Sequence, residues 1–202
     1  MRDERRAFFE QLANSWDLAA GNESLPYVME RLQIQPGERI LDVGAGTGRL
    51  SRALAKAVGP QGFVVSMDFS LAMLRAGKRK EYPSRQHFLC ADAVDLPFVH
   101  ACFDRVVCFC CFPHFRDQHA ALQALSRTLV PGGRLYVIHE DCSQSVNAMH
   151  RQIGGIVAHD YLPSAEALGA MMHSCGLRCM VKEERPALFW CEGVRETRAA
   201  ES

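Results

Sequence analysis

Short apolar runs alternate with helical patterns over the first two thirds of the chain. Each run is apolar throughout, which is typical of strands whose two faces are both buried. Between the runs, leucines recur on one face of residues 48–58 and 117–129, and Ser70 is placed to cap a helix that reaches about Lys80. This alternation predicts a parallel sheet with helices on both sides. The predicted strands are residues 39–43, 62–68, 87–92, 103–111 and 132–140.

The last third of the chain has a different rhythm. Ser164 precedes apolar residues spaced as on one helix face, and Gly176 stands where a helix commonly ends. Two apolar segments, "LRCMVKEE" and "ALFWCEG", then surround the dipeptide "RP", a connection so short that the two strands must pair antiparallel. The sequence therefore predicts an α/β domain with a doubly wound, mostly parallel sheet and an antiparallel strand at the C-terminus.

Charge and cysteine content narrow the range of functions. Lysine plus arginine equal aspartate plus glutamate at 23 each, and a chain this neutral is a poor candidate for nucleic-acid binding. No apolar run approaches ~18 residues, so we expect no transmembrane segment, and the opening residues do not read as a secretory signal. Nine cysteines at irregular positions favour free structural thiols in a reducing cytoplasm.

The segment "ILDVGAGTGRL", residues 40–50, places three glycines directly after the first predicted strand. Ligands of open α/β sheets bind at this edge, and glycines let them approach the backbone closely. The spacing G-x-G-x-G differs from the G-x-G-x-x-G of dinucleotide-binding domains. The first three strands end near Asp42, Asp68 and Asp92, so three carboxylates surround the site. Such charges repel a pyrophosphate and favour a cationic nucleoside, whose ribose hydroxyls Asp68 is spaced to accept.

These motifs resemble, in order and spacing, those of class I S-adenosylmethionine-dependent methyltransferases, most of all the ubiquinone/menaquinone type. The resemblance covers about residues 8–140 and is carried by Trp16–Asp17 together with "ILDVGAGTGRL", "VVSMDFSLAML", "ADAVDLPF", "FDRVVCFCCFPHF" and "LVPGGRLYVIHE". It implies a Rossmann-like sheet of seven strands with a reversed last strand, and S-adenosylmethionine as the cofactor. By this resemblance, the residues that contact the cofactor are Asp42, Gly44, Ala45, Gly46, Asp68, Phe69, Met73, Asp92, Ala93, Cys108 and Phe109.

The resemblance also divides the chain, which we expect to form a single domain over residues 1–202. Residues 1–30 are a helical cap, 39–140 the cofactor-binding core, 141–176 a helical insertion on the acceptor side, and 177–192 the C-terminal hairpin. The implied activity is methyl transfer to a small-molecule acceptor by in-line displacement in a desolvated cleft. We expect a cytoplasmic monomer or homodimer that binds no nucleic acid. An aminopropyltransferase and a non-catalytic cofactor- or metal-binding module are the alternatives.

Histidines gather in the segments that the resemblance places near the transferable methyl group. One hypothesis is a single histidine base, with His139 first and His114 and His159 as further candidates. A second is a divalent metal that activates a thiol or oxyanion acceptor. The candidate ligands of that metal are His139, His150, His159 and Asp160. In a third hypothesis the histidines have no chemical role, and alignment of the reactants in a dry cleft is the whole mechanism.

Overall fold

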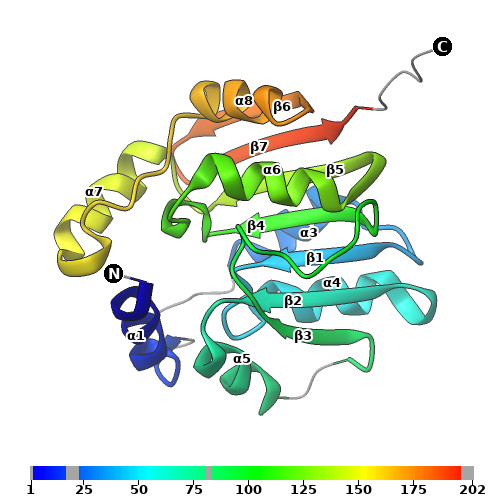
Figure 1. The fold of residues 1–202 in the computed structure, drawn as a ribbon, viewed down its shortest axis with the longest axis horizontal. Helices are drawn as coiled ribbons and strands as arrows, with labels where there is room; N and C mark the ends of the chain where they lie inside the picture. Colours follow the sequence, from blue (N-terminus) through cyan, green and yellow to red (C-terminus); the bar gives the residue numbers. More distant parts are fainter. Residues whose placement is uncertain (1, 17–22, 81–82, 197–202) are drawn as a thin grey trace.

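A computed structural model describes residues 2–16, 23–80 and 83–196 of the chain. One seven-stranded sheet runs through the molecule in the order β3-β2-β1-β4-β5-β7-β6, with helices on both of its faces (Figure 1). The strands are β1 Arg39–Val43, β2 Phe63–Asp68, β3 Gln86–Cys90, β4 Phe103–Phe109, β5 Leu129–His139, β6 Leu177–Arg185 and β7 Leu188–Arg195. The helices are α1 Arg2–Leu12, α3 Leu25–Leu32, α4 Arg49–Val58, α5 Leu71–Lys78, α6 Gln118–Thr128, α7 Ser143–Ile153 and α8 Ala165–Ser174, with short 3-10 turns η1 Gly59–Gln61, η2 Phe112–His114 and η3 Gly155–Val157.

The strand directions agree with those predicted from the sequence. β1 pairs in parallel with β2 and β4, β2 pairs in parallel with β3, and β4 does so with β5. β7 runs antiparallel to both β5 and β6, so the reversed strand lies between its neighbours and β6 forms the edge. The predicted Rossmann-like sheet with a reversed last strand is confirmed. Because β1 to β5 are parallel, their carboxyl ends meet along one edge, where open α/β sheets bind ligands.

Two apolar layers hold the helices on the sheet. On one face, α6 and α8 bring side chains such as Leu122 and Met172 against alternate residues of the central strands. On the other face, α3 and α4 pack Leu32 and Leu54 against the remaining positions. Since each strand feeds both layers, the central strands read as continuous apolar runs.

The predicted caps start and end their helices. At the start of α5, the Ser70 hydroxyl accepts a hydrogen bond from the backbone N–H of Met73 at 3.3 Å. Ser164 accepts one in the same way from Ala167 at the start of α8. After α8, Gly176 adopts a φ of 75°, a conformation that glycine tolerates without steric cost. The helix signals in the sequence are confirmed at these ends.

Two strands end two residues earlier than predicted, and both ends lie at the ligand-binding edge. β4 ends at Phe109, two residues early, because Cys110 adopts a φ of 54° that breaks the strand. The chain then turns back, and the Cys111 thiol donates to the carbonyl of Val43 at 3.0 Å. β3 ends at Cys90, so Asp92 lies beyond the strand in a turn.

The predicted insertion 141–176 has two parts with different roles. α7 and η3 border the cavity described below. α8 instead buries Leu168 and Met172 in the core beside β6 and β7, so it belongs to a layer of the sheet. Of this segment, α7 and η3 border the cavity, whereas the apolar face of 165–174 packs on the sheet.

The structure bears on two expectations drawn from composition, free cysteines and the absence of a membrane-spanning helix. All nine cysteines are free, as the irregular spacing predicts. None of the described helices is long and apolar enough to cross a membrane. The predicted Trp16–Asp17 pair is described only in part: Trp16 follows α1, and Asp17 lies outside the described residues.

Candidate active site

The glycine segment forms the floor of a cleft at the carboxyl edge of the sheet. Gly44 and Gly46 have φ values of 64° and 55°, a region that residues with a side chain rarely adopt. A Cβ at Gly44 would lie 2.5 Å from the Cβ of Cys111, and one at Gly46 would lie 3.4 Å from the indole nitrogen of Trp16. The backbone is bare because the walls of the cleft stand close to it on both sides.

Asp68 ends β2 and organises the glycine segment. One carboxylate oxygen accepts from the backbone N–H of Gly46 and the other from that of Ser70, each at 2.8 Å. The side chain is almost fully buried, and burial raises the pKa of Asp68 to about 6 despite these hydrogen bonds. Each carboxylate oxygen has a second lone pair, so Asp68 retains acceptor capacity for a ligand that lies on the glycines.

Asp42 is a second buried carboxyl beneath the same segment. It accepts a hydrogen bond from the hydroxyl of Ser51 on α4, and only 1% of its surface is exposed. Burial raises the pKa of Asp42 to about 7, and the nearby charge of Asp68 adds to this shift. A cationic ligand would favour the ionised form of both carboxyls, so the floor of the cleft is suited to a positive charge.

The cleft has two lobes that share a wall formed by Phe9, Trp16, Gly44, Gly46 and His114. The small lobe has a volume of about 160 Å³ and lies between the ends of β1, β2 and β3. The large lobe, of about 700 Å³, lies between α1, α7 and the ends of β4 and β5. Among the predicted cofactor residues, those that line the small lobe are Gly44, Gly46, Asp68, Phe69, Met73, Asp92 and Ala93. Those that line the large lobe are Asp42, Gly44, Ala45, Gly46 and Phe109.

Cys108 is the one predicted cofactor residue that lies away from the cleft. It is fully buried among the apolar side chains between the sheet and α6, and it lines neither lobe. The prediction fails because β4 ends at Phe109, so the chain turn brings Cys110 to the large lobe and Cys111 to the small lobe instead. The Cys108 assignment is thus corrected.

His139 ends β5 and lines the large lobe. It is 4% exposed, and its Nε2 atom has no hydrogen-bond partner in the described part of the chain. Burial, together with the nearby His114 and His150, lowers the pKa of His139 to about 3. The imidazole is therefore neutral and takes up a proton poorly, which suits a hydrogen-bonding role better than the base role that the sequence ranked first.

His114 is held by a carboxylate in the manner of a catalytic base. Its Nδ1 lies 2.6 Å from the Oδ2 atom of Asp160, so Nε2 is the nitrogen available to a ligand. Burial lowers the pKa of His114, and the hydrogen bond to Asp160 opposes that shift without overcoming it. The same Asp160 carboxylate accepts from Arg5 of α1 at 2.6 Å. These side chains converge on the wall shared by the two lobes.

The four candidate metal ligands do not come together. His159 is exposed and lines neither lobe, and the Asp160 carboxylate is engaged by Arg5 and His114. His150 is buried, with its Nδ1 2.9 Å from the backbone carbonyl of Asp160. Over residues 2–16, 23–80 and 83–196, no three His, Cys, Asp or Glu side chains are placed to hold a metal ion. The metal hypothesis and the base role of His159 therefore lack the geometry that they require.

Several residues of the cleft were missing from the sequence-based set. Phe8, Phe9 and Leu12 of α1 line the large lobe, although the sequence showed them only as one face of an amphipathic helix. Arg49 of α4 pairs with Glu140 at 3.2 Å and stacks on Phe109 at 4.8 Å. Such contacts join segments distant in sequence, so only the apolar face of α1 gave a local signal that could have found them.

Comparisons with known proteins agree with this geometry. Residues 40–133 match a family model described as a methyltransferase domain. The chain is 34% identical over 168 residues to the ubiquinone/menaquinone biosynthesis C-methyltransferase UbiE of Vibrio parahaemolyticus. The match covers 70% of this chain and 65% of that protein. The chain belongs to the class I S-adenosylmethionine-dependent methyltransferases. The UbiE of Coxiella burnetii is 33% identical over 147 residues, a match that covers 67% of this chain and 59% of that protein.

Solved structures share the fold of this chain. A chain of the complex between the Haloferax volcanii Trm112 methyltransferase activator and a methyltransferase superposes with a TM-score of 0.80, at 18% identity, and covers 94% of this chain and 98% of that one. A SAM-dependent methyltransferase from Aquifex aeolicus gives 0.73, at the same identity and coverage. Because the matched region is less than two thirds of the length of the UbiE relatives, their activity and substrate do not transfer directly.

The cofactor of this family, S-adenosylmethionine, fits the residues of the cleft. The bare backbone at Gly44 and Gly46 leaves the approach to the floor open. Asp68 has acceptor capacity for ribose hydroxyls, and Phe69 and Met73 form apolar walls of the same lobe. The buried carboxyls of Asp42 and Asp68 suit the positive charge of a sulfonium or an ammonium group.

Proposed function

We propose that this chain transfers a methyl group from S-adenosylmethionine to a small-molecule acceptor that occupies the large lobe. The observation that carries the proposal is the continuity of the two lobes across Gly44 and Gly46. The small lobe, with the Asp68 carboxylate, opens there into a second, larger lobe of about 700 Å³ that carries three histidines, His114, His139 and His150. That volume lies in the range of small-molecule binding sites.

The cofactor is held in the small lobe and along the glycine floor that the two lobes share. Asp68 accepts the ribose hydroxyls, while Phe69 and Met73 pack on the adenine, whose edge meets Asp92 and Ala93. The floor residues Asp42, Gly44, Ala45 and Gly46 hold the amino-acid end, next to Phe109. When bound, the cofactor supplies an electrophilic methyl group on a sulfonium. The protein then has to align an acceptor with that methyl group and keep water out.

The acceptor side supplies a proton acceptor and a hydrogen-bonding group. Asp160 orients His114, whose Nε2 takes the proton that the acceptor releases. His139 binds a polar group of the acceptor through its unpaired Nε2. Phe8, Phe9 and Val157 shield this region from water. General base catalysis contributes roughly 10²–10⁴-fold, so this chemistry adds to the effect of alignment.

The acceptor class that these walls favour is an apolar ring with an ionisable hydroxyl group. Deprotonation of such a hydroxyl makes the oxygen, or a ring carbon conjugated to it, nucleophilic. The printed name of the UbiE relatives, C-methyltransferase, supports carbon as the atom methylated. The aminopropyltransferase and non-catalytic alternatives receive no support from the comparisons.

The charge and the free thiols of the chain support a proposal for its cellular compartment and its partners. Nine free cysteines support a reducing cytoplasm, and equal numbers of acidic and basic residues support a protein that acts without nucleic acid. We infer a monomer or a homodimer.

The test is turnover by purified protein. The protein is incubated with methyl-labelled S-adenosylmethionine and a panel of hydroxylated aromatic compounds, and product is detected by transfer of label and by mass. The proposal predicts a methylated aromatic product whose formation requires folded protein. If the protein binds the cofactor and methylates amines or thiols but no member of the panel, the acceptor class is wrong.

A further inference from the structure

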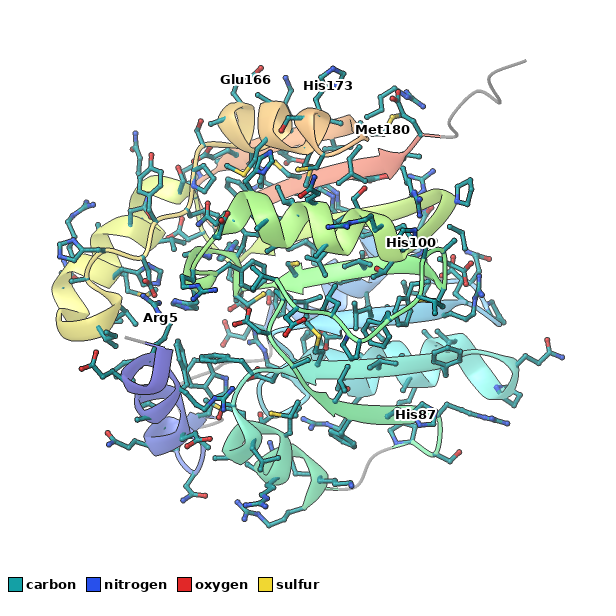
Figure 2. The ribbon with its side chains drawn as sticks, in the orientation of Figure 1. Arg5, His87, His100, Glu166, His173 and Met180 are labelled. Atoms are coloured by element: carbon teal, nitrogen blue, oxygen red, sulfur yellow. The ribbon has the colours of Figure 1, made fainter. Side chains whose placement is uncertain are left out.

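Arg5 ties helix α1 to the opposite wall of the cleft. Its Nη1 lies 2.6 Å from both carboxylate oxygens of Asp160, and its Nη2 donates to the carbonyl of Ile156 at 3.4 Å. The Asp160 side chain is only 4% exposed, and the Arg5 side chain is 24% exposed. Figure 2 shows Arg5 at the end of α1 that faces α7. This ion pair joins residues 155 positions apart, at the place where α1 meets η3.

The carboxylate that anchors Arg5 is also the one that orients His114. The Oδ2 atom of Asp160 lies 2.6 Å from Nδ1 of His114 and 2.6 Å from Nη1 of Arg5. α1 carries Phe9 as well, whose ring packs edge-on against His114 with centroids 5.0 Å apart. The helix that covers the cleft therefore touches both the base and the carboxylate that holds it.

We propose that Arg5 is a positioning residue that makes His114 a proton acceptor only when α1 covers the cleft, by sharing the Asp160 carboxylate with it. The inference rests on the role of His114 in the proposed function. It adds that closure of α1 over the cleft and conversion of His114 to a proton acceptor occur together, because both depend on the Arg5–Asp160 ion pair.

The charges around His114 give the direction of this coupling. The titratable and charged groups that face it are Asp160, Arg5, His150 and His139. With Arg5 in place, its positive charge offsets that of the carboxylate, and burial keeps the imidazole neutral with a free lone pair on Nε2. If α1 moves away, Arg5 leaves and water enters. Both changes favour the protonated imidazolium, which accepts no proton.

The coupling has a chemical purpose. A base that is active in an open cleft could deprotonate an acceptor while water still surrounds it, and the anion would be reprotonated before methyl transfer. With the coupling, the acceptor loses its proton only after the apolar side chains of α1 have excluded water.

The test is the titration of His114 in the acceptor-free protein, followed by NMR of its ring protons and assigned with His114→Gln. Arg5→Gln removes the positive charge and should move the titration midpoint upward. Asp160→Asn removes the negative charge and should move it downward. Arg5→Lys keeps the charge and should return the midpoint toward the parent value. Arg6→Gln is the matched control, since Arg6 is the next residue of α1 and lies near Cys90.

The opposite signs separate the proposal from simple loosening of the structure. Loosening would expose His114 in both variants and move both midpoints upward, toward the ordinary value. Equal upward shifts in Arg5→Gln and Asp160→Asn, or no shift in a folded Arg5→Gln, would overturn the proposal. Arg5→Met provides the same test if Arg5→Gln does not fold, and binding of S-adenosylhomocysteine confirms the fold of each variant.

A kinetic readout follows once an acceptor is known. In Arg5→Gln, the acid limb of the kcat/KM profile should move to higher pH by the same amount as the His114 titration, and Arg6→Gln should keep the parent profile. The titration needs no acceptor, so opposite shifts with no methylated product would leave this inference intact and count against the proposed function. The converse result would count against this inference alone.

Discussion

The two lobes of the cleft are built in different ways. In the small lobe, a buried carboxyl is tied to the backbone: Asp68 accepts from the N–H groups of Gly46 and Ser70, 22 and 2 residues away. At the wall that the two lobes share, polar side chains hold one another across long stretches of sequence: Arg5 and Asp160, 155 residues apart, fix His114. In the large lobe, Nε2 of His139 has no hydrogen-bond partner among the residues that the structure describes.

This difference matches the two proposed tasks: the small lobe binds a cofactor of fixed shape, and the large lobe binds the acceptor that reacts. Backbone donors have little freedom, so the small lobe is preorganised for one ligand shape. The side-chain network depends on the position of α1, which carries Arg5 and Phe9, and we propose that it forms only when α1 covers the cleft. The buried Nε2 of His139, which lacks a partner among the described residues, is where we propose that the acceptor binds.

The largest effect is expected from substitution of His114, which should lower turnover and leave cofactor affinity nearly unchanged. His114→Gln should lower turnover by roughly 10²–10⁴-fold while the affinity for S-adenosylhomocysteine stays within about twofold, because His114 lies on the wall between the lobes and is not among the residues proposed to hold the cofactor. Rates and calorimetry measure the two effects. His159→Gln is the matched control, since that side chain is exposed and lines neither lobe. A large loss in the control and none at His114 would reverse the assignment of the base.

The next effect is expected in the small lobe. Gly46→Val should weaken cofactor binding by at least about 100-fold, or ~2.7 kcal/mol, because the side chain would enter the cleft toward Trp16 from a φ of 55°. Gly132→Val is the control for backbone strain alone, since Gly132 has a φ of 78° with open space around it. Comparable cofactor affinity in the two variants, measured by calorimetry, would show that Gly46 does not border the ligand.

The pH dependence of stability tests the account of the buried carboxyl beneath the glycine floor. Burial raises the pKa of Asp42 to about 7, so its ionisation is harder in the folded state than in the unfolded state. The stability from this group is complete below the unfolded pKa of about 4 and is lost as pH rises through about 7. Asp42→Asn keeps an acceptor for Ser51 and avoids that loss. Its unfolding free energy relative to the parent should therefore increase between pH 4 and 8, by on the order of 2 kcal/mol.

Asp104 provides the matched control for this pH series. The hydrogen bond from Arg39 holds the pKa of Asp104 below its ordinary value. Its stability contribution is therefore present above the unfolded pKa and is lost as pH falls, so Asp104→Asn should lose stability relative to the parent as pH rises. Denaturant unfolding at four or five pH values measures both trends, and trends of the same sign would contradict the account of Asp42.

A smaller effect is expected where the large lobe is incomplete. His139→Phe replaces a buried unpaired nitrogen with carbon beside Phe189, whose ring centroid lies 6.0 Å from that of His139. The variant should gain about 1 kcal/mol of stability, because the desolvation cost of the nitrogen disappears, and should lose affinity for the acceptor. Chemical denaturation measures the gain in stability, and the KM for the acceptor measures the loss of affinity. A variant that loses stability and keeps its KM would argue for a structural role.

The sequence predicted the small lobe better than the large one for a physical reason. Strand ends, glycines and carboxylates are local signals, so Gly44, Gly46 and Asp68 could be placed from residue spacing alone. The parallel strands and the hairpin followed from apolar runs and one short turn. Where the local signal was ambiguous the prediction failed: the apolar run through "CFCC" hid the turn at Cys110, and Cys108 was assigned to the cleft although it lies in the core.

The large lobe depends on contacts that no local pattern encodes. Four histidines were recognised from their segments, but which of them meet was decided by the path of residues 141–162. That path buries His150, leaves His159 exposed and brings Asp160 to His114. Arg5 had no signal at all, because a charged residue on an amphipathic helix is ordinarily solvated. Its role appears only when its distant partner is placed.

The measurement that tests the central claim most directly is calorimetric titration of the parent and of Asp68→Ala with S-adenosylmethionine and S-adenosylhomocysteine. The account predicts saturable binding of both ligands at one site per chain, no binding of NAD, and a loss of about 1–3 kcal/mol in Asp68→Ala, the share of hydrogen bonds to a charged group. A parent that binds neither ligand, or a folded Asp68→Ala that binds both with unchanged affinity, would contradict the assignment of this cleft to the cofactor.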